Sequence, residues 1–403
     1  MADSSQHRSE QKTQMNGWRF ALFMALMLAI WALVHGYVFW RLSTIPWIAT
    51  HCSVRSLVLT ALALWLSYPL ARLLNARNLE AVGVPLEYAA AVWIGVLFLM
   101  LAALLAVDLL TVGGWLLPNF TPKLRTGAVL AAGVLSIIGV VQGLRAPVVR
   151  DYEVQMAGLP PERDGFNLVA ISDLHLGTLK GERWLTKLIG RVNDLKPDLV
   201  VIVGDLVDGN VRHVETLIPT LKQLRSPLGV WTVTGNHEYY AGLEGSVHLL
   251  EAAGYGLLHD RWTEVSPGLI LAGVDDLTAK EQFGQGDGAV EKALTNRPPG
   301  ATILLSHTPL GSDAASSAGV DLMLSGHTHA GQIWPFNYLV RIKYKFLNGR
   351  YDVNGMTLIV SRGAGTWGPP MRLWQPSEIL RIKLRSPDSR GSSRYHQIPN
   401  SRR

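Results

Sequence analysis

The sequence predicts four membrane-spanning helices followed by an α/β domain of layered sheets and helices. Two observations on the 403-residue chain lead to this prediction. Four long apolar runs occupy its first third, and from Ala146 onward short β-branched runs alternate with amphipathic stretches. A third observation concerns chemistry, because side chains that can bind metals follow several of the predicted strands directly.

Each apolar run is close to the roughly 20 residues that a helix needs to cross about 30 Å of hydrocarbon. Trp, Tyr or Arg flank the first three runs, as expected of side chains that anchor at a membrane interface. We therefore predict spans at about 20–40, 56–74, 88–110 and 127–144. The protein is expected to be a multi-pass protein of the cell (inner) membrane, with the lipid bilayer as a partner.

Lys and Arg in the short loops predict the orientation of these spans. The segments that share a side with the N-terminus and the large domain carry seven of them, against four on the opposite side. Positive charge favours the cytoplasmic side, so we expect the large domain in the cytoplasm. Asp108, an acid within the third run, lies near its end, where it can reach the interface, and we interpret it as structural.

The positive charge of the chain lies mostly outside the α/β domain. Residues 1–150 hold 11 Lys and Arg against 5 Asp and Glu, whereas residues 151–380 hold 19 against 25. Binding of nucleic acid needs a basic patch on the folded domain, so we expect no nucleic-acid partner. The single cysteine, Cys52, excludes an intrachain disulfide. No protein partner can be predicted from the sequence.

Composition divides the chain into four segments. We predict a disordered N-terminus over 1–16, a four-helix transmembrane region over 17–146, the α/β domain over 147–386 and a flexible basic tail over 387–403. Within the domain, strands are predicted at 168–172, 199–203, 230–233, 269–274, 302–305 and 322–324. Helices are predicted at 182–195, 211–224 and 243–253.

Two histidines, His327 and His329, follow the last of these strands. On an extended chain their rings point the same way, which suggests metal ligands, although such a pair is more often incidental. Four further motifs follow other predicted strands. They are Asp173-Leu-His175, Gly204-Asp205-Leu-Val-Asp208, Gly235-Asn236-His237-Glu238 and Ser306-His307. Each alone could be a helix cap, a turn or a core histidine, but five together at strand ends predict a metal site.

This ordered set of motifs resembles the calcineurin-like metallophosphoesterase superfamily over about residues 165–380. The runs 326–332 and 362–372 look in particular like its bacterial membrane-associated branch, which includes phosphodiesterases of the YkuE type. Position 330 is more often Gly in that branch, so Ala330 is a departure that reduces backbone freedom beside the site without removing a ligand. The resemblance does not cover residues 1–145.

The resemblance implies a four-layer sandwich of two β-sheets flanked by helices, with two divalent metal ions. One ion would be held by Asp173, His175 and His329. The other would be held by Asn236, His307 and His327, and Asp205 would bridge the two. Mixed nitrogen and oxygen ligands suit Mn, Fe or Zn better than Ca or Mg. The nucleophile of an in-line attack at phosphorus would be a hydroxide that bridges the metals.

By the same resemblance, His237 protonates the leaving oxygen, and Asp208 orients it and favours its charged form. Asp208 could also cap a helix that begins at Val211, and the two roles are compatible. Glu238 receives no role. Asp275 and Asp276 also follow a strand, but we interpret them as structural because the ligand set is complete without them.

Two stretches bear on the substrate. Residues 334–351 interleave aromatic and basic side chains, which predicts either a membrane-facing rim that positions a lipid phosphate or a hairpin with solvated lysines. The aromatic loop 367–374 is a candidate pocket wall. Within it, Arg372 either contacts a phosphate oxygen of the substrate or is a surface charge.

The sequence thus favours a membrane-anchored, metal-dependent phosphoric ester hydrolase. The expected activity is that of a phosphodiesterase, and the nearby membrane suggests an amphiphilic substrate such as a phospholipid or a lipid-linked sugar phosphate. The alternatives are a phosphomonoesterase acting on proteins or small molecules and a non-catalytic membrane receptor or scaffold with the same fold. Every implied ligand and His237 are present, which disfavours loss of catalysis.

Overall fold

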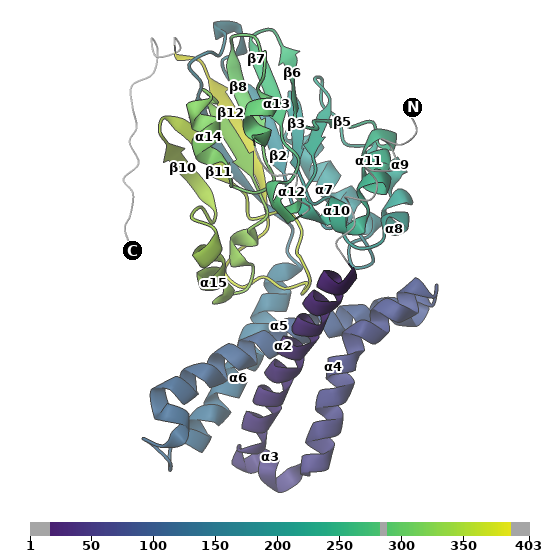
Figure 1. Cartoon of the computed structure of the whole chain (residues 1–403), viewed down its shortest axis with the longest axis vertical. Helices are drawn as coiled ribbons and strands as arrows, with labels where there is room; N and C mark the ends of the chain where they lie inside the picture. The colour runs from purple at the N-terminus through teal and green to yellow at the C-terminus, as the bar shows by residue number, and fades with distance from the viewer. Residues whose placement is uncertain (1–16, 283–287, 388–403) are drawn as a thin grey trace.

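A computed structural model describes residues 17–282 and 288–387 of the chain. In these residues a bundle of long helices lies beneath a domain of two β-sheets (Figure 1). The predicted disordered segment 1–16 lies outside the described residues, as does the predicted basic tail apart from Pro387. The boundaries predicted for the four segments stay predictions.

Four helices among the described residues are long and apolar enough to cross a membrane. They are α2 (Gly17–Ser43), α4 (Val54–Ala76), α5 (Glu80–Thr111) and α6 (Thr121–Gly143), with α3 (Pro46–His51) and η1 (Val112–Gly114) at two of the turns between them. Helix α5 begins at Glu80 rather than near Tyr88, and the two glutamates of its first turns contact the domain above. Thr178 donates a hydrogen bond to the buried Glu87 carboxylate (3.0 Å), and His213 lies 3.5 Å from Glu80.

The acid within the third span is paired with basic side chains of other helices. Asp108 forms ion pairs with Arg41 on α2 (2.6 Å) and Arg125 on α6 (2.8 Å), and it accepts a hydrogen bond from the hydroxyl of Tyr37 (2.7 Å). A half-buried charge that is paired in this way joins three helices of the bundle. The pairing fits the structural interpretation of Asp108.

The domain contains two six-stranded sheets. The order in the first is β1 (Val148–Gln155), β12 (Glu378–Arg385), β2 (Phe166–Ile171), β3 (Leu199–Val203), β4 (Val230–Val233) and β5 (Gly256–Leu257). The order in the second is β10 (Gly349–Val353), β11 (Met356–Val360), β9 (Leu322–Ser325), β8 (Ala301–Leu305), β7 (Leu269–Gly273) and β6 (Arg261–Ser266). The runs β2-β3-β4-β5 and β11-β9-β8-β7 are parallel, so the carboxyl ends of their strands share an edge in each sheet.

Strand β3 shows why the sheets stack as layers. All five of its residues are apolar and buried, and successive side chains point to opposite faces. Val201 and Val203 pack between the two sheets, whereas Val200 and Ile202 pack against helices on the outer face of the first sheet. Those helices are α7 (Glu182–Asp194), α8 (Val211–Glu215), α9 (Ile218–Leu221) and α11 (Leu243–Ala252).

Helices α13 (Ala289–Ala293) and α14 (Ser312–Ser317) cover the outer face of the second sheet. Helices and two sheets therefore form four layers, and the fold class expected from the resemblance is confirmed (Figure 1). Three short helices, α10 (Asn236–Ala241), α12 (Leu277–Gln282) and α15 (Phe336–Lys343), lie toward the edge that faces the bundle.

Two local predictions need correction. The helix predicted over 211–224 is two short helices, α8 and α9, and Pro219 lies in the first turn of α9, where a proline is tolerated. Most of segment 334–351 is helix α15 and the loop after it, so the hairpin alternative does not describe this segment.

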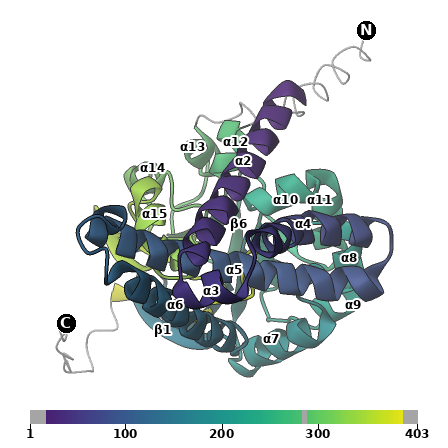
Figure 2. The same cartoon turned by 90° about the horizontal axis from the view of Figure 1, so that it is seen from below.

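The domain contacts the bundle through the loop between β11 and β12. The backbone N–H of Arg372 donates to the Gly139 carbonyl on α6 (2.9 Å), and the N–H of Trp374 donates to the Gln142 side chain (2.9 Å). A Cβ at Gly143 would clash with the backbone around Pro370, so glycine permits this close approach. Figure 2 shows the bundle helices lying across the underside of the domain. The packing places one end of both sheets beside the four long apolar helices.

Candidate metal centre

The predicted ligands gather at the shared edge of the two sheets. Asp173 follows β2, Asp205 follows β3 and Asn236 follows β4, while His307 and His327 follow β8 and β9 of the second sheet. Parallel strands that end at one edge carry the residues after them to the same place, although these residues are far apart in sequence. The structure therefore brings together all seven side chains that the resemblance implies as ligands.

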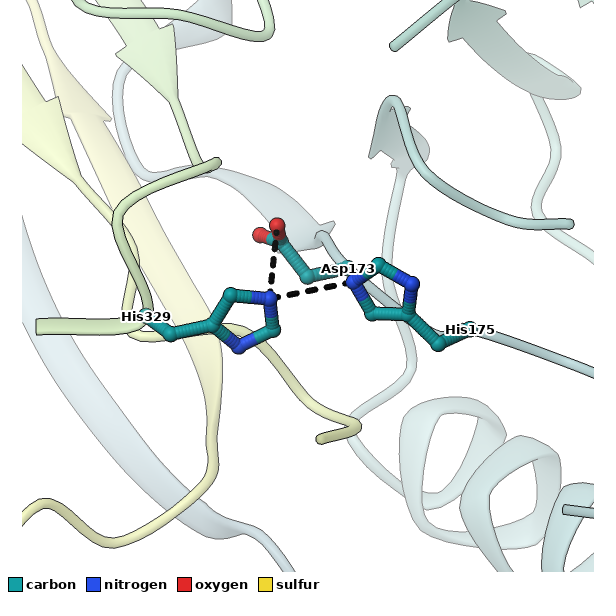
Figure 3. A group of neighbouring side chains, drawn as sticks. All are labelled: Asp173, His175 and His329. Carbon is teal, nitrogen blue, oxygen red and sulfur yellow. Dashed lines mark hydrogen bonds and ion pairs between the residues drawn. The ribbon is translucent and has the colours of Figure 1, made fainter. Parts of the chain in front are cut away.

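Asp173, His175 and His329 form one group of side chains (Figure 3). The Nε2 atom of His329 lies 3.0 Å from Nε2 of His175 and 3.4 Å from a carboxylate oxygen of Asp173. Burial, together with neighbouring positive groups, lowers the pKa of His175 to about 3 and lowers that of His329 well below its usual value. Both rings are therefore neutral near pH 7, which is the form that binds a metal.

Asp205, His307 and His327 form a second group, which Asn236 joins. Nδ1 of His327 lies 2.9 Å from the Asn236 side-chain oxygen and 3.3 Å from Nε2 of His307. Burial lowers the pKa of His327 to about 3. Burial also acts to lower the pKa of His307, but the adjacent Asp205 carboxylate outweighs it and raises the pKa. This anionic environment attracts cations.

The carboxylate of Asp205 lies between the two groups. Its Oδ2 atom is 3.1 Å from Nε2 of His307 in one group and 3.7 Å from Nε2 of His175 in the other. Burial acts to raise the pKa of Asp205, but His307 and His237 outweigh it and keep the pKa well below its usual value. An ionised carboxylate in this position fits the bridging role that the resemblance implies.

The chemistry of these donors suits a divalent transition metal. Carboxylate oxygens, an amide oxygen and imidazole nitrogens lie close enough to one another that a cation between them could bind several at once. Nδ1 of His307 lies 2.8 Å from the Val203 carbonyl, to which it can donate, and this leaves Nε2 free to bind a metal. Nε2 of His327 lies 2.7 Å from the hydroxyl of Tyr344, a contact that orients this ring and that the sequence did not reveal.

Five of the predicted ligands lie in the left-handed backbone region. Asp173, His175, Asp205, His327 and His329 have φ between 47° and 67°. Such conformations cost on the order of 1 kcal/mol or more each and occur where the surroundings enforce them, often at functional sites. Ala330 shares this conformation (φ 54°), which explains why glycine would be easier to accommodate at this position.

His237 and Asp208 lie beside the first group. Nδ1 of His237 is 3.1 Å from a carboxylate oxygen of Asp208. Burial lowers the pKa of His237, but the Asp205 and Asp208 carboxylates outweigh it and raise the pKa to about 9. The charged form can therefore donate a proton from its other nitrogen. The alternative role of Asp208 as a helix cap is not observed, because the Asn210 side chain caps α8.

Glu238 has a role that the sequence analysis did not assign. Its buried carboxylate accepts hydrogen bonds from four backbone N–H groups, those of Asp205, Leu206, Val207 and Gly235, at 2.7–3.0 Å. Glu238 thereby fixes the turn that carries Asp205. A glutamate at the third position of a helix often bonds back to the N–H of the cap, and this rule could have indicated part of the role.

Arg372 is fully buried rather than exposed to a substrate. Its guanidinium donates to the carbonyls of Arg362, Gly363, Gly365 and Gln375, and Nη2 lies 3.3 Å from Nδ1 of His329. These contacts do not favour the predicted binding of a phosphate oxygen or the surface alternative. They support a role in holding the loop after β11 against His329.

Asp275 and Asp276 lie behind the site, in keeping with a structural role. Asp275 accepts a hydrogen bond from Thr234 (3.0 Å) and lies 2.8 Å from Nδ1 of His259. Asp276 accepts the backbone N–H of Ala279 (2.7 Å) and so caps α12.

Replacing Glu238 with Gln should weaken the site through its backbone. The amide of Gln has an NH₂ group in place of one carboxylate oxygen, so the backbone N–H groups that this oxygen accepted lose their partner. Each buried N–H group left without a partner lowers the stability of the fold by about 1–3 kcal/mol. We expect Glu238→Gln to lower the free energy of unfolding and to reduce bound metal, measured by thermal unfolding and elemental analysis. The exposed Glu251→Gln on α11 is the matched control. Unchanged metal content in Glu238→Gln would contradict this role.

Comparison with known proteins agrees with this geometry. Residues 166–331 match the family model described as "Calcineurin-like phosphoesterase". A "Transmembrane protein with metallophosphoesterase domain" from Danio rerio is 38% identical over 270 residues, which cover 64% of this chain and 62% of that protein. The chain thus spans less than two thirds of the length of that relative.

Bacterial relatives are also similar. An "Uncharacterized metallophosphoesterase" from Helicobacter pylori is 36% identical over 273 residues, which cover 66% of this chain and 71% of that protein. The "Uncharacterized metallophosphoesterase YkuE" from Bacillus subtilis is 30% identical over 250 residues, which cover 59% and 85% respectively. The similarity is therefore wider than the bacterial YkuE-type branch. With its five motifs gathered at one sheet edge, the chain belongs to the calcineurin-like metallophosphoesterases.

Proposed function

We propose that this protein is a membrane-anchored, metal-dependent phosphodiesterase with a cytoplasmic catalytic domain. The observation that carries the proposal is the position of the Asp205 carboxylate between two groups of ligands, with His237 beside them. Family membership supports hydrolysis of a phosphoester, and the four long apolar helices support membrane attachment.

The residues present fit two divalent ions, held as the resemblance implies, with Mn, Fe and Zn as the candidates. When bound, such a pair supplies an activated water and neutralises the charge that develops at phosphorus. Asp205 would contact both ions. The backbone N–H of His237 (2.9 Å) and the Glu238 network hold Asp205 in place, so the carboxylate needs no rearrangement.

His237 would give its proton to the leaving oxygen. The Asp208 carboxylate, 3.1 Å from Nδ1, fixes the ring and stabilises its positive charge, so the other nitrogen carries the proton to be transferred. The side chain of His237 is 12% exposed and lines a cavity beside the ligands, where a leaving group can lie. Asp208 is thus a positioning residue for the general acid.

Space on two sides of the ligands favours a diester over a monoester. Two cavities in the described part of the chain share Asn236 and His327 in their walls and extend from them in different directions. A monoester has one organic arm and would fill one cavity, whereas a diester has two arms. Monoester hydrolysis is the alternative activity.

The diester preference can be tested with two chromogenic substrates. The full chain in detergent with added Mn²⁺ should hydrolyse bis(4-nitrophenyl) phosphate with a kcat/KM at least about tenfold above that for 4-nitrophenyl phosphate, because only the diester places an arm in each cavity. EDTA should abolish both activities, and Mn²⁺ should restore them. A higher kcat/KM for the monoester would favour the phosphomonoesterase, and no turnover with Mn²⁺, Fe²⁺ or Zn²⁺ would rule out the enzyme.

Removing the imidazole of His237 should lower the rate without removing metal. A general acid contributes about 10²–10⁴-fold, so His237→Ala should reduce kcat on a diester with an alkyl leaving group by at least about 100-fold. An activated 4-nitrophenolate leaving group needs less help and should lose less. The exposed His248→Ala is the control, with wild-type kcat expected. Loss of bound metal in His237→Ala would instead make His237 a ligand.

The orientation can be measured independently of activity. The excess of Lys and Arg on the side of the catalytic domain supports a cytoplasmic position for this domain. Alkaline phosphatase fused after Arg403 in a bacterial host should therefore be inactive, and a fluorescent protein fused there should be bright. The opposite pair of results would put the domain outside the cytoplasm.

A further inference from the structure

The candidate metal centre lies between two cavities that differ in character. The first has a volume of about 480 Å³ and runs from the ligands to helices α5 and α15. The second, of about 430 Å³, opens toward Tyr240 and Thr278, whose side chains are polar. Both cavities include Lys343 and Tyr344 in their walls. A phosphate at the ligands would therefore have an apolar space on one side and a polar space on the other.

The far wall of the first cavity belongs to the membrane region. Ile94 and Phe98 on α5 face Ile333, Leu339 and other apolar residues at the start of α15 and along it. Helix α5 is one of the four helices that are long and apolar enough to span a membrane. The cavity therefore extends from the ligands to a helix that is long and apolar enough to lie in a bilayer.

Helix α15 forms the other side of this opening and has the character of an interfacial helix. The side chains of Ile342, Tyr338 and Leu339 are 83%, 58% and 55% exposed. The helix lies on the side of the domain that faces the bundle (Figures 1 and 2). Apolar side chains exposed at such a place are stabilised by insertion into the headgroup region, and the neighbouring Arg341 and Lys343 suit anionic lipid.

Helices α5 and α15 meet at the edge of the cavity. The rings of Phe98 and Phe336 are 5.7 Å apart and perpendicular, and both line the cavity. At its inner end, Lys343 lies beside the ligand His327, where an ammonium can pair with a phosphate oxygen. Apolar walls at one end and positive charge at the other match a long-chain phosphoester.

Resting on the proposed function, we infer that the substrate is an amphiphilic phosphodiester taken from the bilayer. Its apolar arm occupies the cavity between α5 and α15, its phosphate lies at the ligands beside Lys343, and its polar arm extends toward Tyr240 and Thr278. The occupant of the apolar cavity is the long chain of a lipid.

The position of His237 assigns the bond that breaks. His237 lines the apolar cavity and not the polar one. Its proton therefore goes to the oxygen that carries the apolar arm. A water molecule loses one proton to solvent as its oxygen forms the new bond to phosphorus. The bond from phosphorus to the lipid oxygen breaks, His237 protonates that oxygen, and His237 then regains a proton from solvent. The products are a lipid alcohol, which stays in the membrane, and the phosphomonoester of the polar arm.

Photo-crosslinking tests occupancy without requiring activity. The EDTA-treated full chain would be placed in nanodiscs that contain phosphatidylglycerol with a diazirine in one acyl chain. We expect adducts on Ile333, which is 6% exposed and lines the cavity. Leu339→Glu places a charge in the cavity wall and should reduce the Ile333 adducts at least tenfold. Lys187→Glu, exposed on α7 and in the wall of neither cavity, introduces the same charge away from α15 and should leave them unchanged.

Adducts confined to the outer surfaces of the bundle helices would overturn the inference.

The bond assignment is tested with Mn²⁺-loaded protein and phosphatidylglycerol. Diacylglycerol and glycerol phosphate are expected, whereas phosphatidic acid and glycerol would overturn the assignment. Hydrolysis of bis(4-nitrophenyl) phosphate without Ile333 adducts or lipid products would reject the lipid substrate and leave the proposed phosphodiesterase standing. Absence of all diester hydrolysis would reject the proposed function itself. The adducts do not depend on activity, so they would still show whether lipid occupies the cavity.

Discussion

The placement of the Asp205 carboxylate is the constraint on which the rest of the site depends. One of its oxygens lies within 3.7 Å of histidine nitrogens from two separate ligand groups, and the other accepts the N–H of His237. This placement requires a left-handed backbone at Asp205 and close packing against Gly235. Glu238 makes the turn possible, because its carboxylate accepts the N–H groups that the turn leaves without partners.

Burial of so many polar groups is costly unless a cation compensates them. Burial raises the pKa of Asp173 to about 6, and it depresses the pKa of three of the histidines. These shifts reflect the free energy spent in removing ionisable groups from water. Bound divalent ions would recover part of this free energy, so metal binding and the stability of the domain are expected to be linked.

The long apolar helices also take part in the surroundings of the site. Glycines on α6 let the loop after β11 approach the bundle, and the same loop holds Arg372 under His329. Phe98 on α5 reaches the cavity that adjoins the ligands. A phosphoesterase domain bound in this way has its candidate ligands close to helices that are long and apolar enough to cross a membrane.

The sequence by itself determined the spans, the alternation of strands and helices and the gathering of the ligands. These follow from local patterns, because hydropathy depends on composition, and residues after parallel strands necessarily share an edge. The tertiary structure alone decided the roles of Arg372 and Tyr344 and the contact of Glu238 with the turn after β3, since each depends on partners distant in sequence or on the path of a loop. It also decided that α5 begins at Glu80 and that α15 is a helix beside it. Local patterns do not encode which elements pack together, and so the cavity between α5 and α15 could not be foreseen from the sequence.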